Sequence, residues 1–282
     1  MSRFAGRRAI VTGASRGIGA AVAERLAAEG ASVAITARTL AAEPDARLAG
    51  SLEETAARLR AHGGDVAVVT ADLTDETSRS TIVPAAVDAL GGPIDVVVNN
   101  AAAAIYQPLA DFPLKRRRLI FEVNLHAPID LAQAVLPSMV ERGEGWIVNV
   151  SSATASLWSG PPFSLGTLGA TSGVYGASKA ALNRLTNAMA AELWESGVRL
   201  NTVEPRAAVL SEGADALVGS QLRPDQIESM EEMVEAVVAL CDCPAERTGR
   251  VHVSLDLIAE LGLDVRALDG GTWDRNGSAS RS

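Results

Sequence analysis

The first forty residues constrain the fold of this chain more than any other stretch. Four segments follow one another as strand, glycine loop, helix and strand: 8–11, 12–19, 17–29 and 32–36. Gly13, Gly17 and Gly19 are spaced G-x-x-x-G-x-G. Ile18, Val22 and Leu26 then recur on one helical stripe, which predicts a helix packed on a sheet. A short buried strand on each side predicts a parallel βαβ unit.

A glycine loop in this context is typical of dinucleotide binding. Its backbone can approach a pyrophosphate, whose charge is stabilised by the N–H groups and dipole of the following helix. The second strand ends in Thr-Ala-Arg-Thr and lacks the acidic residue that holds a ribose 2′-hydroxyl in NAD enzymes. Arg38, with Arg16 in the loop, can instead pair with a 2′-phosphate, so we expect NADP(H) to be preferred over NAD(H). The alternative is that both arginines point into solvent.

Strand and helix signals alternate along the rest of the chain, which predicts a doubly wound α/β fold with a parallel sheet. The expected strands are 8–12, 32–36, 66–70, 94–98, 146–150, 198–203 and 250–254. The expected helices are 17–29, 51–62, 75–90, 115–141, 174–196 and 226–241. Pro84 should kink or split the third of these helices.

Composition agrees with one soluble domain. A chain of 282 residues that is 48% hydrophobic can bury one large core, expected over residues 1–268. Residues 269–282 are rich in Gly, Ser, Arg and Asn, which predicts a disordered tail. We expect no membrane span and, without an apolar leader, a cytoplasmic location. The net charge of −9 disfavours nucleic-acid and anionic-membrane partners.

Tyr175 and Lys179 carry the clearest chemical signal. The chain has only two tyrosines and two lysines, yet one of each stands four positions apart in Tyr-Gly-Ala-Ser-Lys. On a helix these positions share a face, so the ammonium could lie beside the phenol and lower its pKa from about 10. An ordinary helix with an exposed tyrosine and a solvated lysine is the alternative. Taken with the glycine loop, the pair favours a catalytic tyrosine.

These features resemble the short-chain dehydrogenase/reductases over most of residues 5–255. Asp72-Leu73 is similar to the family's adenine-contacting segment. Asn99-Asn100-Ala101-Ala102 resembles its Asn-Asn-Ala-Gly segment, with the last glycine replaced. Asn124 and Ser152 match the family's Asn on the central helix and Ser at a strand end.

The resemblance implies a Rossmann-type, seven-stranded parallel sheet with helices on both faces, and the reaction that follows. Hydride would pass between NADP(H) and a carbonyl or secondary alcohol, with Tyr175 as general acid and base. Ser152 would bind the carbonyl oxygen, Lys179 the nicotinamide ribose, and Asn124 a water that links Lys179 to solvent. Ser151 is the competing assignment for Ser152. The expected cofactor-binding residues are Gly13, Ser15, Arg16, Gly17, Ile18, Gly19, Arg38, Asp72, Leu73, Asn100, Ala101, Tyr175, Lys179 and Pro205.

The chain also departs from the family pattern. Ser152 and Tyr175 are 23 positions apart, a longer spacing than the family's. Trp158 and Phe163 in the extra segment, 156–166, could form an apolar wall of the substrate pocket. The alternative is a loop packed against its own surface or a neighbouring subunit.

A second departure follows the sixth strand. Pro205-Arg206 replaces the family's Pro-Gly, and Leu210 stands where a nicotinamide-contacting Thr is expected, so Ser211 could substitute. These changes, with Ala102, keep a second function class open, which is a cofactor-binding scaffold without turnover. We expect an apolar substrate, such as a steroid, terpenoid or aliphatic ketone.

Three further patterns bear on partners. The basic run 115–118 favours a solvated helix face over an anionic-ligand site. Cys241 and Cys243 favour structural thiols, because no second cysteine pair or histidine cluster completes a metal site. By resemblance, the Ala-rich helices 115–141 and 174–196 would form a four-helix interface in a homodimer or homotetramer.

Overall fold

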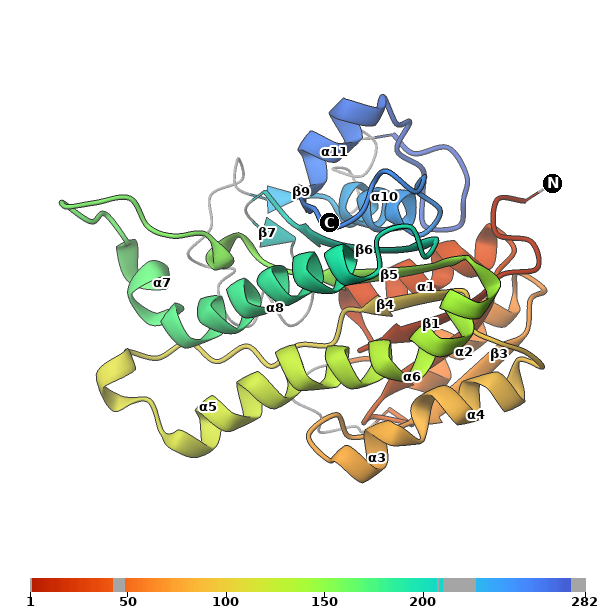
Figure 1. Ribbon diagram of the computed structural model, residues 1–282, viewed down its shortest axis with the longest axis horizontal. Helices are drawn as coiled ribbons and strands as arrows, with labels where there is room; N and C mark the ends of the chain where they lie inside the picture. The colour runs from red at the N-terminus through yellow and green to blue at the C-terminus, as the bar shows by residue number, and fades with distance from the viewer. Residues whose placement is uncertain (1, 43–48, 207, 210–226, 275–282) are drawn as a thin grey trace.

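The computed structural model describes residues 2–42, 49–206, 208–209 and 227–274. Its centre is a seven-stranded parallel sheet in the order β3-β2-β1-β4-β5-β6-β9 (Figure 1). The strands are β1 Arg8–Thr12, β2 Ser32–Ala37, β3 Val66–Thr70, β4 Val96–Asn99, β5 Gly145–Val150, β6 Val198–Glu204 and β9 Val251–Val253. This confirms the Rossmann-type fold expected from the sequence.

Helices cover both faces of the sheet (Figure 1). The α-helices are α1 Gly17–Ala28, α2 Leu52–Arg60, α3 Glu76–Ser80, α4 Ile82–Ala89, α5 Leu114–Phe121, α6 Ala127–Arg142, α7 Gly166–Thr171, α8 Gly173–Glu192, α10 Met230–Leu240 and α11 Ser254–Leu261. The shorter elements are the 3₁₀ turns η1 Leu109–Asp111 and η3 Ala153–Ala155, the π-helical turn η2 Glu122–His126, and a parallel pair, β7 Ala208–Val209 and β8 Ile227–Glu228.

The core has two halves because successive strand residues point to opposite faces. Val11 and Val33 belong to the half beneath α1, α2 and α10. Ile10 and Ala34 belong to the half beneath α4, α6 and α8. Burial on both faces explains why these strands are apolar almost throughout.

Two predicted helices differ from those observed. The helix expected over 75–90 is split at Thr81 into α3 and α4, and Pro84 lies in the first turn of α4, where a proline is tolerated. The helix expected from 226 begins only at Met230, because Ser229 caps it in a capping box with Glu232. Neither α7 nor α11 was expected.

Part of the expected tail is ordered. Arg266 and Thr272 form an antiparallel bridge, so the ordered chain runs past the expected boundary at 268; residues 275–282 lie outside the described part. Arg25 on α1 is fully buried and donates to the carbonyl oxygens of Arg266 and Ala267, both at 3.2 Å. Its guanidinium also pairs with Glu29 at 2.5 Å and Glu235 at 2.7 Å. A buried charge needs such partners, so this network fixes the C-terminal turn to α1 and α10.

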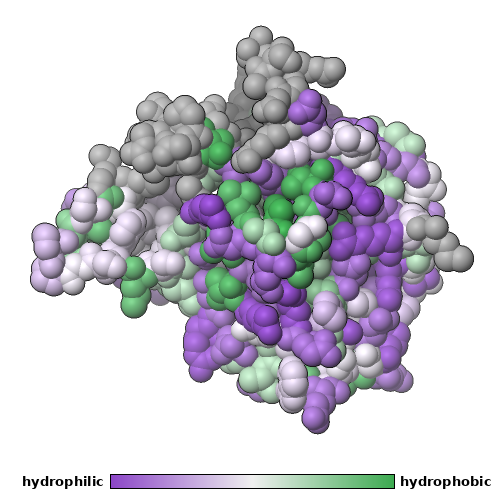
Figure 2. Space-filling view, turned by 90° about the horizontal axis from the view of Figure 1, so that it is seen from above, coloured by the Kyte–Doolittle hydropathy of each residue, from purple (hydrophilic) through white to green (hydrophobic). Residues whose placement is uncertain are grey.

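One described helical stretch, 114–142, is long and apolar enough to span a membrane by length and composition alone, with a mean hydropathy of 1.2. Core helices of globular proteins pass the same test, and α6 within it packs on the sheet through Leu131, Val135 and Met139. The face seen from above is mostly hydrophilic, with an apolar area near its middle and smaller apolar spots elsewhere (Figure 2).

Candidate active site

The glycine loop and the end of β4 meet at the carboxyl edge of the sheet. Strand β1 lies between β2 and β4 in the sheet. Its pairing with β4 brings residues 12–13 next to residues 100–101. Thr12 Oγ1 accepts hydrogen bonds from the backbone N–H groups of Asn100 at 3.1 Å and Ala101 at 3.0 Å. The Asn100 side chain donates to the carbonyl oxygens of Thr12 and Gly13. This is the topological switch point, where ligands bind in sheets of this kind.

Glycine is required at two positions of the loop. A Cβ on Gly13 would lie 2.8 Å from Ala101 Cα, and Gly13 has a φ of +67°. A Cβ on Gly19 would lie 2.4 Å from Asn100 Nδ2 and 2.5 Å from the Gly13 carbonyl oxygen. Arg16 supplies no side-chain cap to α1, so the first N–H groups of that helix face the loop. A loop without side chains at Gly13 and Gly19, directly before a helix N-terminus, fits a pyrophosphate.

The basic residues expected to select the cofactor lie on the same side of the sheet. Arg38 is exposed at the end of β2, and Arg16 is half-buried, with Nη2 donating to the Gly50 carbonyl oxygen at 3.5 Å. Burial raises the pKa of Asp72, but hydrogen bonds from Thr74 and the charge of Arg38 outweigh it and lower that pKa. Asp72 Oδ1 already accepts from Thr74 N and Oγ1, so this carboxylate also shapes its own turn.

Ser152 and Tyr175 face each other from two different elements. The Ser152 hydroxyl lies close enough to the Tyr175 phenol to lower the pKa of that phenol, and it lies 2.9 Å from Thr154 Oγ1. Tyr175 is buried at the start of α8, which packs against η3. Gly176 permits this contact, because a Cβ there would lie 2.3 Å from the Thr154 carbonyl oxygen. The sequence analysis identified the tyrosine and the serine but missed the glycine that brings them together.

Ser151 points elsewhere, as alternation along a strand requires. Its hydroxyl lies against the Glu204 carboxylate, which Asn183 of α8 also contacts. Burial raises the pKa of Glu204, and the nearby polar groups of Asn183 and Ser151 partly offset that rise. Of the two adjacent serines, the one beside the tyrosine is therefore Ser152.

The expected electrostatic pairing of Lys179 with Tyr175 is not found in this structure. Lys179 is fully buried, and its Nζ donates to the Val150 carbonyl oxygen at 2.7 Å. Burial lowers the pKa of Lys179 to about 8. The pKa of Tyr175 is raised, mainly by burial and then by the neighbouring Tyr106, and the Ser152 hydroxyl offsets only part of that rise. Burial therefore controls the pKa of both groups.

Asn124 occupies the π-helical turn between α5 and α6, a feature often found at functional sites. Its Oδ1 accepts from Ala103 N at 2.7 Å, and its Nδ2 donates to the Ala103 carbonyl oxygen at 3.2 Å and to Ser178 Oγ at 3.0 Å. The side chain thus holds the loop that follows β4 against α8. Both amide protons are used in this way, which the sequence analysis did not foresee.

Arg79 is a buried residue that the sequence analysis also missed. Its guanidinium donates to the Leu73 carbonyl oxygen at 3.1 Å, beside the expected adenine-contacting segment. It also donates at 2.5 Å to Glu122, the first residue of the π-helical turn, and to Asp130 on α6. One side chain therefore joins the cofactor side of the sheet to the turn that carries Asn124.

Arg206, the departure after Pro205, has a structural explanation. Its backbone N–H donates to Glu228 Oε2 at 3.2 Å, and its guanidinium pairs with Asp256 on α11. Glu228 is buried and accepts from Ser254 as well. The chain beyond β6 is thus anchored through its side chains. The expected substitution of Ser211 for a threonine near Leu210 lies outside the described residues.

The segment between Ser152 and α7 projects from the body of the molecule (Figure 1). Trp158 is 48% exposed and Phe163 is 59% exposed. Trp158 lies against Gly169 of α7, and Phe163 lies against Gly160 in its own loop. This arrangement favours the alternative of a loop packed on its own surface over a formed pocket wall.

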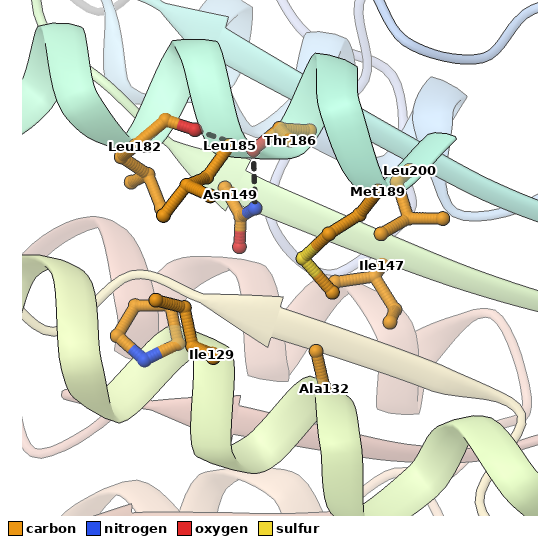
Figure 3. A pocket seen from close by; sticks show the side chains of 10 residues that line it. Ile129, Ala132, Ile147, Asn149, Leu182, Leu185, Thr186, Met189 and Leu200 are labelled. Carbon is orange, nitrogen blue, oxygen red and sulfur yellow. Dashed lines mark hydrogen bonds between the residues drawn. The ribbon is translucent and has the colours of Figure 1, made fainter. Parts of the chain in front are cut away.

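A small hollow lies between α6 and α8, and Tyr175 is not among the residues that line it (Figure 3). Its volume is about 10 Å³, which is enough for a single water molecule and too small for a substrate. Apolar side chains line it, and Asn149 donates to Thr186 across it at 2.8 Å. We therefore take the Tyr175 region as the candidate site.

The remaining sequence patterns show no further chemistry. Residues 115–118 are all exposed, as a solvated helix face requires. Cys241 and Cys243 are buried free thiols, and burial raises the pKa of both, that of Cys243 to about 11. Within the described ranges, no three His, Cys, Asp or Glu side chains gather as metal ligands.

A family model described as short chain dehydrogenase matches residues 7–217. The chain belongs to the short-chain dehydrogenase family. A short chain dehydrogenase of Pseudocercospora fijiensis is 36% identical over 234 residues, which cover 82% of this chain and 69% of the relative. Hydroxysteroid dehydrogenase-like protein 2 of Danio rerio is 30% identical and covers 95% of this chain. That match spans only 62% of the relative's own length.

Solved structures of the family share this fold. A 3-oxoacyl (acyl-carrier-protein) reductase from Agrobacterium tumefaciens with NADP bound has a TM-score of 0.73 and 28% identity, covering 89% of this chain and 93% of that one. A putative NAD(P)-dependent gluconate 5-dehydrogenase from Beutenbergia cavernae, with NADP at low occupancy, has a TM-score of 0.73 and 30% identity. That match covers 89% of this chain and 95% of the other. This short-chain dehydrogenase is therefore an oxidoreductase of a family that binds NAD(P).

Proposed function

We propose that this protein transfers a hydride between NADP(H) and a carbonyl or secondary alcohol, with Tyr175 as the proton donor and acceptor. The observation that carries the proposal is the approach of the Ser152 hydroxyl to the Tyr175 phenol, with Lys179 one turn further along α8. This pair and the bare glycine cradle follow strands of one parallel sheet at its carboxyl edge. A hydrogen-bond donor, a proton donor and a phosphate site on one edge are the parts that this reaction needs.

Each side chain has a distinct task in the proposed reaction. Bound nicotinamide would supply or accept the hydride. The Ser152 hydroxyl would donate a hydrogen bond to the substrate oxygen, where negative charge develops. The Tyr175 phenol would give its proton to that oxygen in reduction and take one back in oxidation.

The remaining two groups of the proposed machinery would support the phenol. The Lys179 ammonium would hold the nicotinamide ribose and stabilise the phenolate that forms when Tyr175 has given up its proton. The π-helical turn with Asn124 would hold the water through which that proton is replaced from solvent.

The choice of cofactor rests on Arg16 and Arg38. Support comes from the position of Arg16 in the loop after β1, from the exposed Arg38 directly after β2, and from the lack of an acidic residue at the end of β2. A charge-assisted contact with phosphate contributes roughly 1.5–3 kcal/mol, so one arginine can set a preference of tenfold or more. Arg38→Asp should move the ratio of kcat/KM values for NADPH and NADH toward NADH. An unchanged ratio would remove the basis of this preference.

The substrate is proposed to be a small apolar carbonyl compound or alcohol. Support comes from a buried apolar cluster of Phe112, Ile120 and Val174, the last of which directly precedes Tyr175 in the sequence, with Ile105 packed against it. The relatives include a protein named 1-deoxy-11-beta-hydroxypentalenate dehydrogenase, from Streptomyces exfoliatus, 38% identical over 71% of this chain. Apolar ketones and alcohols should therefore be tried first, with polar ones beside them.

A homodimer or homotetramer built on α6 and α8 is part of the proposal. Ile129, Leu185 and Met189 are only half-buried around the hollow in Figure 3, as residues of an interface would be in one isolated chain. Sedimentation of the purified protein would test this, and a monomer at micromolar concentration would contradict it. The cytoplasmic location stays a prediction.

The experiment that tests the function is consumption or formation of reduced nicotinamide cofactor with a panel of carbonyls and alcohols. Tyr175→Phe should lower kcat by at least about a hundredfold, because general acid catalysis contributes that much, and should leave cofactor affinity intact. Tight cofactor binding with no turnover on any substrate, in either direction, would favour the non-catalytic scaffold instead.

A further inference from the structure

Tyr106 packs directly on the proposed catalytic tyrosine. The ring centroids of Tyr106 and Tyr175 are 5.6 Å apart, and the ring planes cross at 85°, an edge-to-face arrangement. These are the only two tyrosines of the chain. Tyr106 is half-buried on the loop between β4 and η1. No motif in the sequence points to it.

The loop that carries Tyr106 is held on both sides of that residue. On one side, Asn124 contacts both the N–H and the carbonyl oxygen of Ala103. On the other, the Gln107 N–H donates to the Thr171 carbonyl oxygen at 3.0 Å, at the end of α7.

Side chains complete the support of the loop. Gln107 Nε2 donates to the Asp111 carbonyl oxygen at 2.6 Å, and its Oε1 accepts from Arg116 at 2.9 Å. Ile105 packs against the apolar cluster that contains Val174, the residue just before the proposed catalytic tyrosine. Such support is typical of a side chain that must keep one orientation.

We propose that Tyr106 is a positioning residue, whose ring covers the Tyr175 ring, keeps water from it and fixes the direction of its hydroxyl toward Ser152. This rests on the proposed function, because it concerns the phenol that would transfer the proton. The ring provides the contact in this proposal, so phenylalanine should replace tyrosine at 106 and leucine should not.

The proposal has a consequence for titration. Among the described groups packed around Tyr175, the titratable ones are Tyr106 on the loop and Lys179 on α8, whose ammonium is held by the Val150 carbonyl oxygen. Burial raises the pKa of Tyr175. Loss of the covering ring admits water, so the pKa should fall toward its ordinary value of about 10. If Tyr175 acts as base in alcohol oxidation, the rising limb of the pH–rate profile should then move to lower pH.

The first test does not depend on activity. Both Tyr106→Phe and Tyr106→Leu leave Tyr175 as the single tyrosine, so NMR of isotopically labelled tyrosine reports its ionisation alone. The Phe variant should lose only the contribution of the Tyr106 charge and keep the part of the raised midpoint that burial causes, and the Leu variant should titrate roughly one pH unit below the Phe variant. Equal midpoints in the two folded variants would overturn the proposal. Circular dichroism confirms folding, and Tyr106→Met serves if the Leu variant does not fold.

The second test uses the holoenzyme at saturating cofactor. Tyr106→Phe should keep kcat within about twofold of wild type, and Tyr106→Leu should lose about tenfold in kcat with cofactor KM unchanged. An equal loss in both variants would assign the effect to the Tyr106 hydroxyl and overturn the proposal. Tyr175→Phe separates the two proposals: if it stays active, the proposed function fails. If it is inactive while Tyr106→Leu behaves as wild type, only the role of Tyr106 fails.

Discussion

The glycine loop and the Tyr175 site lie along one sheet edge but are built by opposite means. In the loop, Gly13 and Gly19 let the backbone touch residues 100–101, and any side chain would intrude. Around Tyr175, buried side chains such as Asn124 and Lys179 hold backbone carbonyl groups. The glycine loop depends on the absence of side chains, whereas the Tyr175 site depends on the hydrogen bonds of buried side chains. A substitution should therefore affect cofactor binding in one region and catalysis in the other.

The largest effect on activity is expected at Gly176, because it is a position in the Tyr175 region that requires a glycine. Gly176 belongs to the Tyr175 region, yet a Cβ on it would lie 2.3 Å from the Thr154 carbonyl oxygen. Gly176→Ala should push η3 and Ser152 away from Tyr175 and lower kcat by about a hundredfold or more, while cofactor affinity is kept. Gly173→Ala in the same helix is the matched control, because nothing lies within 4 Å of its Cβ. Equal activity of the two variants would show that the contact is not required.

Gly19→Ala should have the reverse signature. Its Cβ would collide with the Gly13 carbonyl oxygen and Asn100 Nδ2, so the cradle must open. Cofactor affinity should fall by at least about tenfold, with the contact between Ser152 and Tyr175 untouched. Isothermal titration with NADPH measures the affinity. Wild-type affinity together with a reduced kcat would contradict the division between the two regions.

The burial of Lys179 in the Tyr175 region can be tested through the pH dependence of the free energy of unfolding. The pKa of Lys179 falls from 10.5 to about 8 on folding, so the unfolded chain binds more protons between these values and stability should rise as pH rises through that window. Below pH 8 the burial cost is fully present, roughly 3 kcal/mol. Lys179→Met should therefore be more stable than wild type at neutral pH, with the difference shrinking toward pH 10.5. Urea unfolding across that range is the measurement, and a constant difference would contradict it.

Replacing Arg79 should have the smallest effect. Because Arg79 joins the two regions, its loss should change both cofactor binding and catalysis. Arg79→Met leaves Glu122 and Asp130 without their shared cation and frees the Leu73 carbonyl oxygen. We expect a loss of about 1–3 kcal/mol in stability, a weaker cofactor KM and a lower kcat together. Arg58→Met is the control, since Arg58 is exposed and its side chain contacts only Glu24 and, at 3.5 Å, Thr55 Oγ1 among the described residues. A change in KM alone would confine Arg79 to the cofactor side.

The sheet and the glycine loop could be predicted because their signals are local. Buried parallel strands are continuous apolar runs, and a glycine loop before a helix limits the backbone to few conformations. Strand geometry alone could not separate Ser152 from Ser151, since either fits a strand end; the family resemblance favoured Ser152, and the surroundings of the two hydroxyls agree with it. Pro84 predicted a break in its helix, but the break falls at Thr81 because the first turn of α4 accepts proline.

The contacts among loops could not be predicted in the same way. Tyr106, Gly176 and Arg79 act through residues between 6 and 69 positions away, and no periodicity marks such pairs. The pKa expectation for Tyr175 failed for a related reason. A four-residue spacing placed Lys179 on the right face, but only the fold showed that its ammonium turns to the Val150 carbonyl oxygen and that burial dominates the phenol.

The buried guanidinium of Arg25 has a practical consequence for anyone who trims or extends this polypeptide. Two of its acceptors are the carbonyl oxygens of Arg266 and Ala267, beyond the last helix. A truncation after Leu261 looks harmless from the helix boundaries alone. It would remove both carbonyl acceptors and leave the buried Arg25 guanidinium without these two hydrogen bonds. Purification tags are best attached after Asp274, where the described chain has already made these contacts.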